Sequence, residues 1–115
     1  MRIHLVANPT AGRGRARGLT ARLVAEIERR GATATVHWTT GPGDAAAHVA
    51  TLEPAAFDRL VSVGGDGTLH ELINGRPPPL PWPVALVPLG TAKTRIRTAL
   101  QAVRTAMTDD EAPRD

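Results

Sequence analysis

Four short apolar stretches divide the 115-residue chain into regular segments. They are rich in Val, Leu and Ile, and most of their positions are apolar without alternation, as in strands that are covered on both faces. The pattern therefore predicts four buried β-strands, over residues 3–7, 34–38, 59–63 and 83–88.

Helical periodicity fills the intervals between and after these strands. Leu19, Leu23 and Ile27 recur every four residues, and Gly31 follows them as a stop signal, so the first helix is expected over residues 16–31. Shorter apolar patterns predict three more helices, over residues 43–54, 68–75 and 92–107.

The third predicted helix carries Leu69, Leu72 and Ile73 on one face. The segment 76–83, RPPPLPWP, can be neither helix nor central strand because of its prolines, and it predicts a stiff loop before the fourth strand. Residues 109–115 form a charged tail.

Strands that alternate with helices predict right-handed βαβ crossovers and a mostly parallel sheet. We therefore expect an α/β fold of the Rossmann-like type, a three-layer sandwich with helices on both faces of the sheet. We assign residues 1–108 to a single domain.

The composition narrows the class of protein. Hydrophobic residues make up 42% of the chain but aromatic residues only 3%, so the core must be aliphatic. The absence of cysteine excludes disulfides, a thiolate metal site and a thiol nucleophile. No apolar run is long enough for a membrane span, and the N-terminus enters a strand pattern without the features of a signal peptide. These features predict a cytoplasmic protein.

The net charge of +3, with arginine at 13 of the 14 basic positions, raises the question of a nucleic-acid partner. A lysine-rich tract, a pair of aromatic residues for base stacking and zinc-finger spacing are all absent from the sequence. We therefore expect no nucleic-acid partner.

Each predicted strand is followed by a turn that contains both glycine and threonine. The four turns are NPTAGRGRARG (8–18), TTGPGDA (39–45), GGDGTLHE (64–71) and LGTAKT (89–94), whereas the turns at the opposite edge lack this combination. The carboxyl ends of parallel strands meet at one edge, where open α/β sheets bind ligands. The turns therefore predict a ligand site at this edge.

The third turn places Asp66 among three glycines. Glycines allow positive φ and let backbone N–H groups approach a phosphate, and a helix that begins at Thr68 would point its positive end at the same place. A carboxylate beside phosphate becomes useful when it binds Mg²⁺ or accepts a proton from an attacking hydroxyl. The alternative is an ordinary strand-to-helix turn with Asp66 as a cap; the three companion turns favour the ligand site.

The first turn contains Arg13, Arg15 and Arg17 among its glycines. Its spacing matches neither a P-loop nor a dinucleotide-binding fingerprint. We expect these arginines to be solvated, with one of them available to a phosphate.

The motifs NPTAGRG, TTGPGDA, GGDGTLHELING and PLGTA, in this order and spacing, resemble the N-terminal catalytic domain of the diacylglycerol kinase family. That family includes bacterial lipid kinases and the sphingosine and ceramide kinases, with NAD kinases as more distant relatives. The resemblance covers about residues 1–94. It implies the N-terminal domain of a two-domain kinase fold, which uses ATP and Mg²⁺ to transfer the γ-phosphate to a lipid hydroxyl such as that of diacylglycerol.

The resemblance also implies roles for individual residues. Asp66 would lie nearest the chemistry, as the catalytic residue, and Thr39 is a close substitute for Thr40. The residues implied to contact nucleotide are Asn8, Thr40, Gly64, Gly65, Asp66, Gly67, Thr68, Leu69, His70, Gly90 and Thr91. No residue is singled out as a metal ligand.

The sequence departs from the family in two respects. Lys93 and Thr94 stand where family members usually have an amide and a carboxylate near the acceptor site. The family's second, β-rich domain, which helps to hold the lipid, has no counterpart in these 115 residues. The expectation is therefore an incomplete catalytic domain, completed by a second domain or by self-association, that contacts the inner membrane surface peripherally.

Two other functions remain open. A kinase of soluble substrates, of the NAD-kinase kind, shares the GGDGT motif, whereas the NPTAG and TTGPGDA turns favour the lipid branch. A non-catalytic nucleotide-binding module fits the departures at Lys93 and Thr94.

Several remaining polar and aromatic residues receive weaker expectations. Glu71, one turn into the third helix, is expected either to pair with an arginine or to assist the metal. Trp38 and Trp82 are expected in core and loop packing. The histidines of the first half of the chain are expected to be packing or surface residues: His4, His37 and His48.

Overall fold

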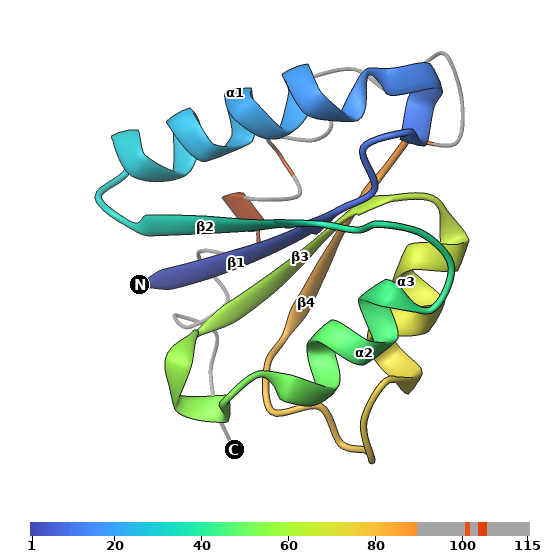
Figure 1. Cartoon of the computed structure of the whole chain (residues 1–115). Helices are drawn as coiled ribbons and strands as arrows, with labels where there is room; N and C mark the ends of the chain where they lie inside the picture. Colours follow the sequence, from blue (N-terminus) through green and yellow to red (C-terminus); the bar gives the residue numbers. More distant parts are fainter. Residues whose placement is uncertain (90–100, 102–103, 106–115) are drawn as a thin grey trace.

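The computed structural model describes residues 1–89, 101 and 104–105. Its four strands pair in parallel, in the order β2-β1-β3-β4. Each predicted strand is confirmed to within one residue at either end. The strands are β1 (Arg2–Ala7), β2 (Thr33–Trp38), β3 (Arg59–Gly64) and β4 (Val84–Pro88) (Figure 1).

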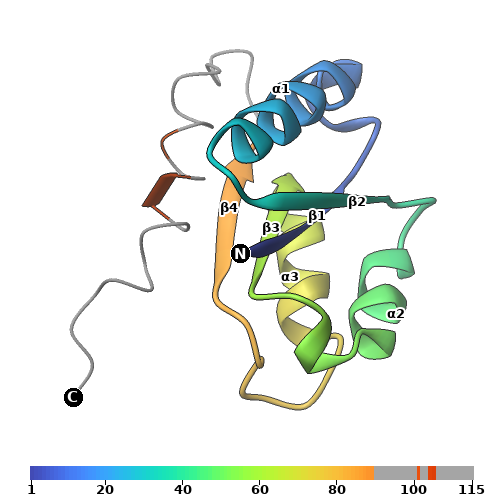
Figure 2. The same ribbon diagram turned by 90° about the vertical axis from the view of Figure 1, so that its left-hand side faces the viewer.

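Three helices cover the two faces of this sheet. Helix α1 (Ala16–Arg29) lies on one face, and α2 (Asp44–Thr51) and α3 (Asp66–Asn74) lie side by side on the other (Figures 1 and 2). Short 3-10 turns, η1 (Ala11–Gly14) and η2 (Pro54–Ala56), precede α1 and β3. The predicted α/β three-layer architecture is confirmed. The fourth predicted helix, over residues 92–107, falls almost entirely outside the described residues.

The strand order reverses between β1 and β3. From β1 the chain passes through α1 to β2, and it then returns through α2 to β3 on the other side of β1. Because βαβ crossovers are right-handed, the reversal puts α1 and α2 on opposite faces. It also opens a crevice at the carboxyl ends of β1 and β3, the switch point at which such sheets bind ligands.

The face under α1 carries the larger apolar core. Leu23 and Ile27 of α1 are fully buried there, in one cluster with Ile3, Leu5 and three valines of β3 and β4: Val61, Val63 and Val87. The cluster is aliphatic apart from the half-buried Trp38, as the low aromatic content predicts. Leu19 is half-buried beside it, so the predicted apolar stripe of this helix is confirmed.

The face under α2 and α3 carries a smaller apolar cluster, which includes Val49, Leu60 and Leu72. Trp82 is buried in this cluster and donates its indole N–H to the carbonyl of Pro54 at 3.1 Å, as expected of a packing residue. The proline-rich segment between α3 and β4 forms neither helix nor strand.

The helix boundaries confirm the predicted end of the first helix and correct the predicted start of the third. Gly31 follows α1 with a φ of +87° and donates its N–H to Glu28, so it acts as the predicted stop. Helix α3 begins at Asp66, two residues before the predicted start. Its buried face is also narrower than the sequence suggests: Thr68 and Leu72 are buried, whereas Ile73 is 47% exposed.

None of the helices in the described part of the chain combines the length and the hydrophobicity that a transmembrane span requires.

Candidate functional site

A cleft of about 420 Å³ opens at the carboxyl edge of the sheet. It lies between the turn after β1, the turn after β2 and the first turns of α3. Two of the predicted glycine- and threonine-containing turns and the helix that follows the third therefore converge on one site. The residues that line it are Asn8, Pro9, Thr10, Thr39, Thr40, Gly41, Pro42, Ala45, Gly67, Thr68 and Glu71.

Backbone hydrogen bonds between strand ends draw these turns together. The N–H of Asn8 donates to Val63 at 3.0 Å, and the N–H of Thr39 donates to Ala7 at 2.9 Å. At the other side of β3, the N–H of Leu89 donates to Gly64 at 3.1 Å. The parallel ladder thus continues one residue past each strand and fixes where each turn begins.

The turn after β1 is shaped by the side chain of Asn8. Its Oδ1 accepts hydrogen bonds from the N–H of Thr10 at 3.0 Å and from the hydroxyl of Thr10 at 2.8 Å. This local bonding closes a tight Asx-type turn and places Pro9 and Thr10 at the wall of the cleft.

The turn after β2 depends on positive φ at two glycines. Gly41 has a φ of +156° and Gly43 a φ of +88°, both in the region that residues with a side chain rarely adopt. Gly43 is also the residue that precedes the first turn of α2. Glycine is therefore required here for the backbone path.

The glycines of the GGDGT motif serve other purposes. Gly64, Gly65 and Gly67 are not among the positive-φ residues, so the expectation that positive φ requires them is wrong. A Cβ on Gly64 would lie 3.0 Å from the hydroxyl of Thr68, so a side chain there would require Thr68 to shift. A Cβ on Gly65 or Gly67 would meet nothing within 4 Å, so these two leave the start of α3 uncovered.

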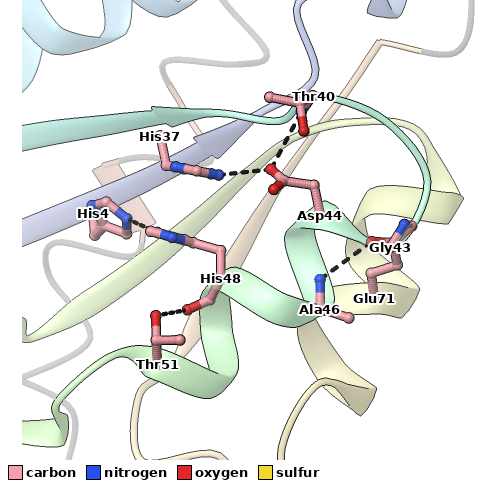
Figure 3. Close-up of polar contacts among 9 residues, drawn as sticks. All are labelled: His4, His37, Thr40, Gly43, Asp44, Ala46, His48, Thr51 and Glu71. Carbon is pink, nitrogen blue, oxygen red and sulfur yellow. Dashed lines mark hydrogen bonds and ion pairs between the residues drawn. The ribbon is translucent and has the colours of Figure 1, made fainter.

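The two helices that begin at the cleft differ in the state of their N-termini. The first N–H groups of any α-helix lack partners within the helix and attract anions. In α2 two such positions are taken by Glu71 of α3, whose carboxylate accepts from the N–H of Gly43 at 3.1 Å and of Ala46 at 3.2 Å (Figure 3). The described contacts place no such carboxylate from another helix at the start of α3.

This role of Glu71 was not expected from the sequence. Its carboxylate lines the cleft but binds the backbone of α2 in place of an arginine. A sequence signal could not have found it, because the contact spans 28 residues and depends on how α3 packs against α2.

A second carboxylate holds the turn after β2 from the other side. Asp44 Oδ2 lies 2.8 Å from His37 Nε2 and accepts the N–H of Thr40 at 3.2 Å (Figure 3). The hydrogen bond from His37 is the main cause that lowers the pKa of Asp44, and burial opposes it. The turn is thus fixed by Asp44 at one end and by Glu71 at the other.

The predicted site residues occupy different positions around the cleft. Asn8, Thr40, Gly67 and Thr68 line it, as does Thr39. The other predicted residues of the third turn do not line it: Gly64 is buried beside Thr68, Gly65 and Leu69 are half-buried, and Asp66 and His70 are exposed in the first turns of α3. Gly90 and Thr91 lie outside the described residues.

The arginines of the first turn are exposed, as expected. Arg15 donates from Nε to the carbonyl of Gly12 at 2.8 Å. The guanidinium of Arg17 lies over the ring of Trp38, 5.2 Å from its centre. The backbone of Arg13 has a positive φ of 60°.

Comparison with known proteins gives this geometry a family context. The model of the diacylglycerol kinase catalytic domain matches residues 2–110. Diacylglycerol kinase of Bacillus subtilis (strain 168) is 33% identical over 91 residues, which cover 78% of this chain and 30% of the relative. Diacylglycerol kinase of Staphylococcus saprophyticus is 32% identical over 92 residues, again 78% of this chain and 30% of the relative.

A solved structure shares the fold. The crystal structure of a diacylglycerol kinase from Bacillus anthracis str. Sterne matches with a TM-score of 0.68 at 22% identity, over 90% of this chain and 43% of that one. The chain therefore spans about a third of the length of the two relatives above and less than half of this structure.

Proposed function

The chain belongs to the diacylglycerol kinase catalytic domain family, and we propose that it binds Mg·ATP in the cleft at the carboxyl edge of its sheet. The family is one of lipid kinases, and the resemblance to it that the sequence motifs indicated is confirmed. ATP, Mg²⁺ and the lipid hydroxyl are the proposed ligands of this chain.

The convergence of the turns carries the proposal. Residues from three separate parts of the chain, Asn8, Thr40 and Thr68, line a single cleft beside the switch point of the sheet. Its volume of about 420 Å³ lies in the range of sites that hold small ligands and cofactors. The lining combines hydroxyls and an amide with open backbone, which suits phosphate oxygens.

The phosphates of the nucleotide are proposed to lie at the start of α3. Gly67 and Thr68 present the first N–H groups of this nine-residue helix to the cleft, and no side chain stands over Gly67. The start of α2 is unsuited to phosphates, because the Glu71 carboxylate already lies there and would repel a second anion.

Asp66 is proposed to act closest to the reaction. It is exposed in the first turn of α3, next to the proposed phosphate position. The described residues hold no group of three His, Cys, Asp or Glu side chains arranged to take a metal ion. This fits Mg²⁺, which is commonly held by substrate phosphates, water and one or two carboxylates, and which would neutralise phosphate charge here. Asp66 is then its protein ligand or the base for the attacking hydroxyl.

The acceptor and the remaining machinery are proposed from the family. Residues 1–108 would form the nucleotide-binding domain, and a second domain or self-association would complete the lipid site. Transfer to a diacylglycerol-like hydroxyl would take place with the protein in peripheral contact with the membrane that holds the lipid. Precise placement of both substrates, more than covalent chemistry, drives phosphoryl transfer.

A titration of Mg·ATP followed by backbone amide NMR tests the nucleotide site. We expect shifts at Asn8, Thr10 and residues 39–41 and 66–69 at millimolar nucleotide. The variant Gly67→Leu places a side chain over the start of α3, where there is open space, and should weaken Mg·ATP binding about tenfold or more, as the loss of one to two kcal/mol of phosphate contacts would.

Gly18→Leu is the matched control. Gly18 also lies in the first turn of a helix, has open space for a side chain and is remote from the lining of the cleft. It should bind Mg·ATP like the wild type. Shifts confined to the opposite edge of the sheet, or equal affinity in the two leucine variants, would show that the nucleotide binds elsewhere.

A further inference from the structure

Three of the four histidines of the chain meet on the α2 side of the sheet. His4 comes from β1, His37 from β2 and His48 from α2, and together we call them the histidine array (Figure 3). His4 Nε2 and His48 Nε2 lie 2.8 Å apart, and the rings of His37 and His48 stack in parallel with centroids 3.6 Å apart. Phe57 stacks on the His4 ring at 4.4 Å.

The parallel register of the sheet explains why these rings share a face. His4 pairs with Thr35, and Val6 pairs with His37, so the two histidines point to the same side of neighbouring strands. His48 reaches them from above because it follows Asp44 by one helical turn.

The array is connected at both ends. His4 Nδ1 lies 2.6 Å from the hydroxyl of Thr35. At the other end His37 Nε2 lies 2.8 Å from Asp44 Oδ2, the oxygen that also accepts the N–H of Thr40. A continuous chain of contacts therefore runs from the buried His4 to the Thr39–Gly43 turn of the cleft.

The bond between His4 and His48 limits how many protons the array can hold. It joins two ring nitrogens, so one must carry the hydrogen while the other accepts it. When both rings are protonated, both nitrogens become donors, the bond is lost and two positive charges face each other. Protonation of both rings therefore breaks the hydrogen bond between His4 of β1 and His48 of α2.

The surroundings make the protonation of both rings unfavourable at neutral pH. Burial, and then the charges of His48 and His37, lower the pKa of His4 to about 4. Burial and His37 also lower the pKa of His48, against a smaller opposite effect of Asp44. In the described chain, the titratable groups that face one another here from β1, β2 and α2 are these three histidines and Asp44; Thr35 and Phe57 are neutral.

We propose that the histidine array is a proton-sensitive support for the Thr39–Gly43 turn, which it holds in place through Asp44 and releases when His4 and His48 are both protonated. The turn forms one wall of the proposed nucleotide cleft, so the effect on ligand binding rests on the proposed function. Glu71 holds the same turn from α3 independently of the array. The expected result of protonation is thus a loosened wall and not an unfolded helix.

The variant His48→Gln removes one titrating ring from the array and keeps a hydrogen-bond donor in its place. His48 is half-exposed, so its replacement leaves the core intact, and a glutamine amide can still donate to His4 Nε2 but cannot titrate. The control is Ala50→Gln, which adds the same side chain to an exposed position of α2 that does not touch the array. Both variants are compared with the wild type from about pH 7.5 down to about pH 4, the value to which the pKa of His4 is lowered.

Two measurements are made on each protein. Histidine ring signals and the amide signals of residues 40–41 and 43–46 are followed by NMR without ligand. In wild type and Ala50→Gln the amide signals should move together with the rings of His4 and His48, with His70 as a ring outside the array; in His48→Gln they should stay near their neutral positions.

The dissociation constant of Mg·ATP is measured over the same pH range. Protonation of ATP itself affects all three proteins equally. We expect the constant to rise about tenfold more in wild type and Ala50→Gln than in His48→Gln, the size expected for one charge-assisted contact.

Amide signals of the turn that ignore the protonation of His4 and His48 would overturn the proposal, as would an equal pH dependence of Mg·ATP binding in wild type and His48→Gln. If amide signals follow the array while Mg·ATP fails to bind at any pH, the proton-sensitive support is established and the nucleotide assignment fails instead. The two ideas are therefore separable.

Discussion

Helix α1 buries Leu23 and Ile27 in a large aliphatic cluster on one face of the sheet, whereas α2 buries only Ala45 and Val49 on the other. The fourteen residues of α1 can present several turns of apolar side chains, and the eight residues of α2 cannot. The two faces must therefore be held by different kinds of contact.

Directed polar contacts add to the small apolar area that α2 buries. Glu71 binds the N–H groups at its start, and Arg76 donates to the carbonyls of Val49 at 3.2 Å and Leu52 at 2.8 Å at its end. Both side chains come from α3 and the residues just after it, and the Arg76 guanidinium lies over the ring of Trp82. Their charges match the two ends of the helix dipole.

The two kinds of contact differ in how they respond to pH. Apolar packing is insensitive to pH and depends on area and shape. Ion- and hydrogen-bonded contacts depend on protonation and can compete with a ligand. The cleft lies on the side of the molecule where charged side chains hold α2 and the turn after β2.

The largest effect on stability is expected from the α1 face. Leu23→Ala removes a fully buried side chain and leaves a cavity in the aliphatic cluster, so the free energy of unfolding should fall by about 3 kcal/mol. Chemical denaturation measures it. Ile73→Ala, at a 47% exposed position of α3, is the control and should change stability by less than about 0.5 kcal/mol. A similar loss in both variants would contradict the assignment of the main core to this face.

The next largest effect on stability is expected at the contact between α2 and α3. Gly75 follows α3, and a Cβ there would lie 2.7 Å from the carbonyl oxygen and 2.9 Å from the Cα of Ala46. Gly75→Ala must therefore push α2 away, and we expect a loss of roughly 1 to 3 kcal/mol in the free energy of unfolding.

Gly18→Ala provides the comparison for this variant. It fills open space in α1 and should be neutral or stabilising by about 0.5 kcal/mol through helix propensity. Equal behaviour of the two alanine variants would mean that α2 and α3 do not pack as closely as described.

The pH dependence of stability distinguishes the α2 face, which contains His4, from the apolar α1 face. The folded-state pKa of His4 is lowered, so the unfolded chain binds more protons below about pH 6.5 and stability falls as the pH drops from 6.5 towards 4. From pH 7.5 to 5.5 the loss should be roughly 1 kcal/mol, allowing for solvent screening.

The carboxylates of Asp44 and Asp58 do not contribute to the change in stability between pH 7.5 and 5.5. The pKa values of Asp44 and Asp58 are lowered, so their contributions are lost only at a lower pH, as the folded carboxylates take up protons. Urea titrations at several pH values measure the slope, which Leu23→Ala should leave unchanged because its contacts are apolar. A flat wild-type profile between pH 7.5 and 5.5 would show that His4 takes up protons freely in the folded state.

The smallest effect on stability, under about 0.5 kcal/mol, is expected from Asp66→Asn. The side chain is exposed and leaves no cavity. Phosphoryl transfer should nevertheless fall by about a hundredfold or more, the size typical of a lost acid–base or charge contact. The assay uses a protein in which the second domain is present, native or grafted. Full activity of the variant would reduce Asp66 to a turn residue.

Much of the fold follows from local patterns in the sequence. The Val-, Leu- and Ile-rich stretches define all four strands, the spacing of Leu19, Leu23 and Ile27 defines α1, and the prolines after Gly75 exclude regular structure. These features depend on neighbours within a few residues, and local sterics and side-chain periodicity are enough to specify them. The family resemblance rests on the same turns.

The candidate site was only partly predictable. Asn8, Thr40, Gly67 and Thr68 stand in glycine-containing turns at strand ends, and the topology of a parallel sheet brings such turns together. The sequence does not predict the contact of Glu71 with α2 or the close packing of Gly64 against Thr68. Both depend on the distance between elements that are far apart in sequence, here α2 to α3 and β3 to Thr68.

The alternation of strands and helices, the glycine-rich turns and the family can be predicted from the sequence, because each depends on contiguous residues. The strand order β2-β1-β3-β4, and with it the position of the crevice between β1 and β3, depends on contacts between distant segments. The tertiary structure also decided that three histidines, each unremarkable in its own element, would form one array. The physical reason is register: a shift of one residue would turn His37 to the other face of the sheet, and no local pattern specifies that pairing.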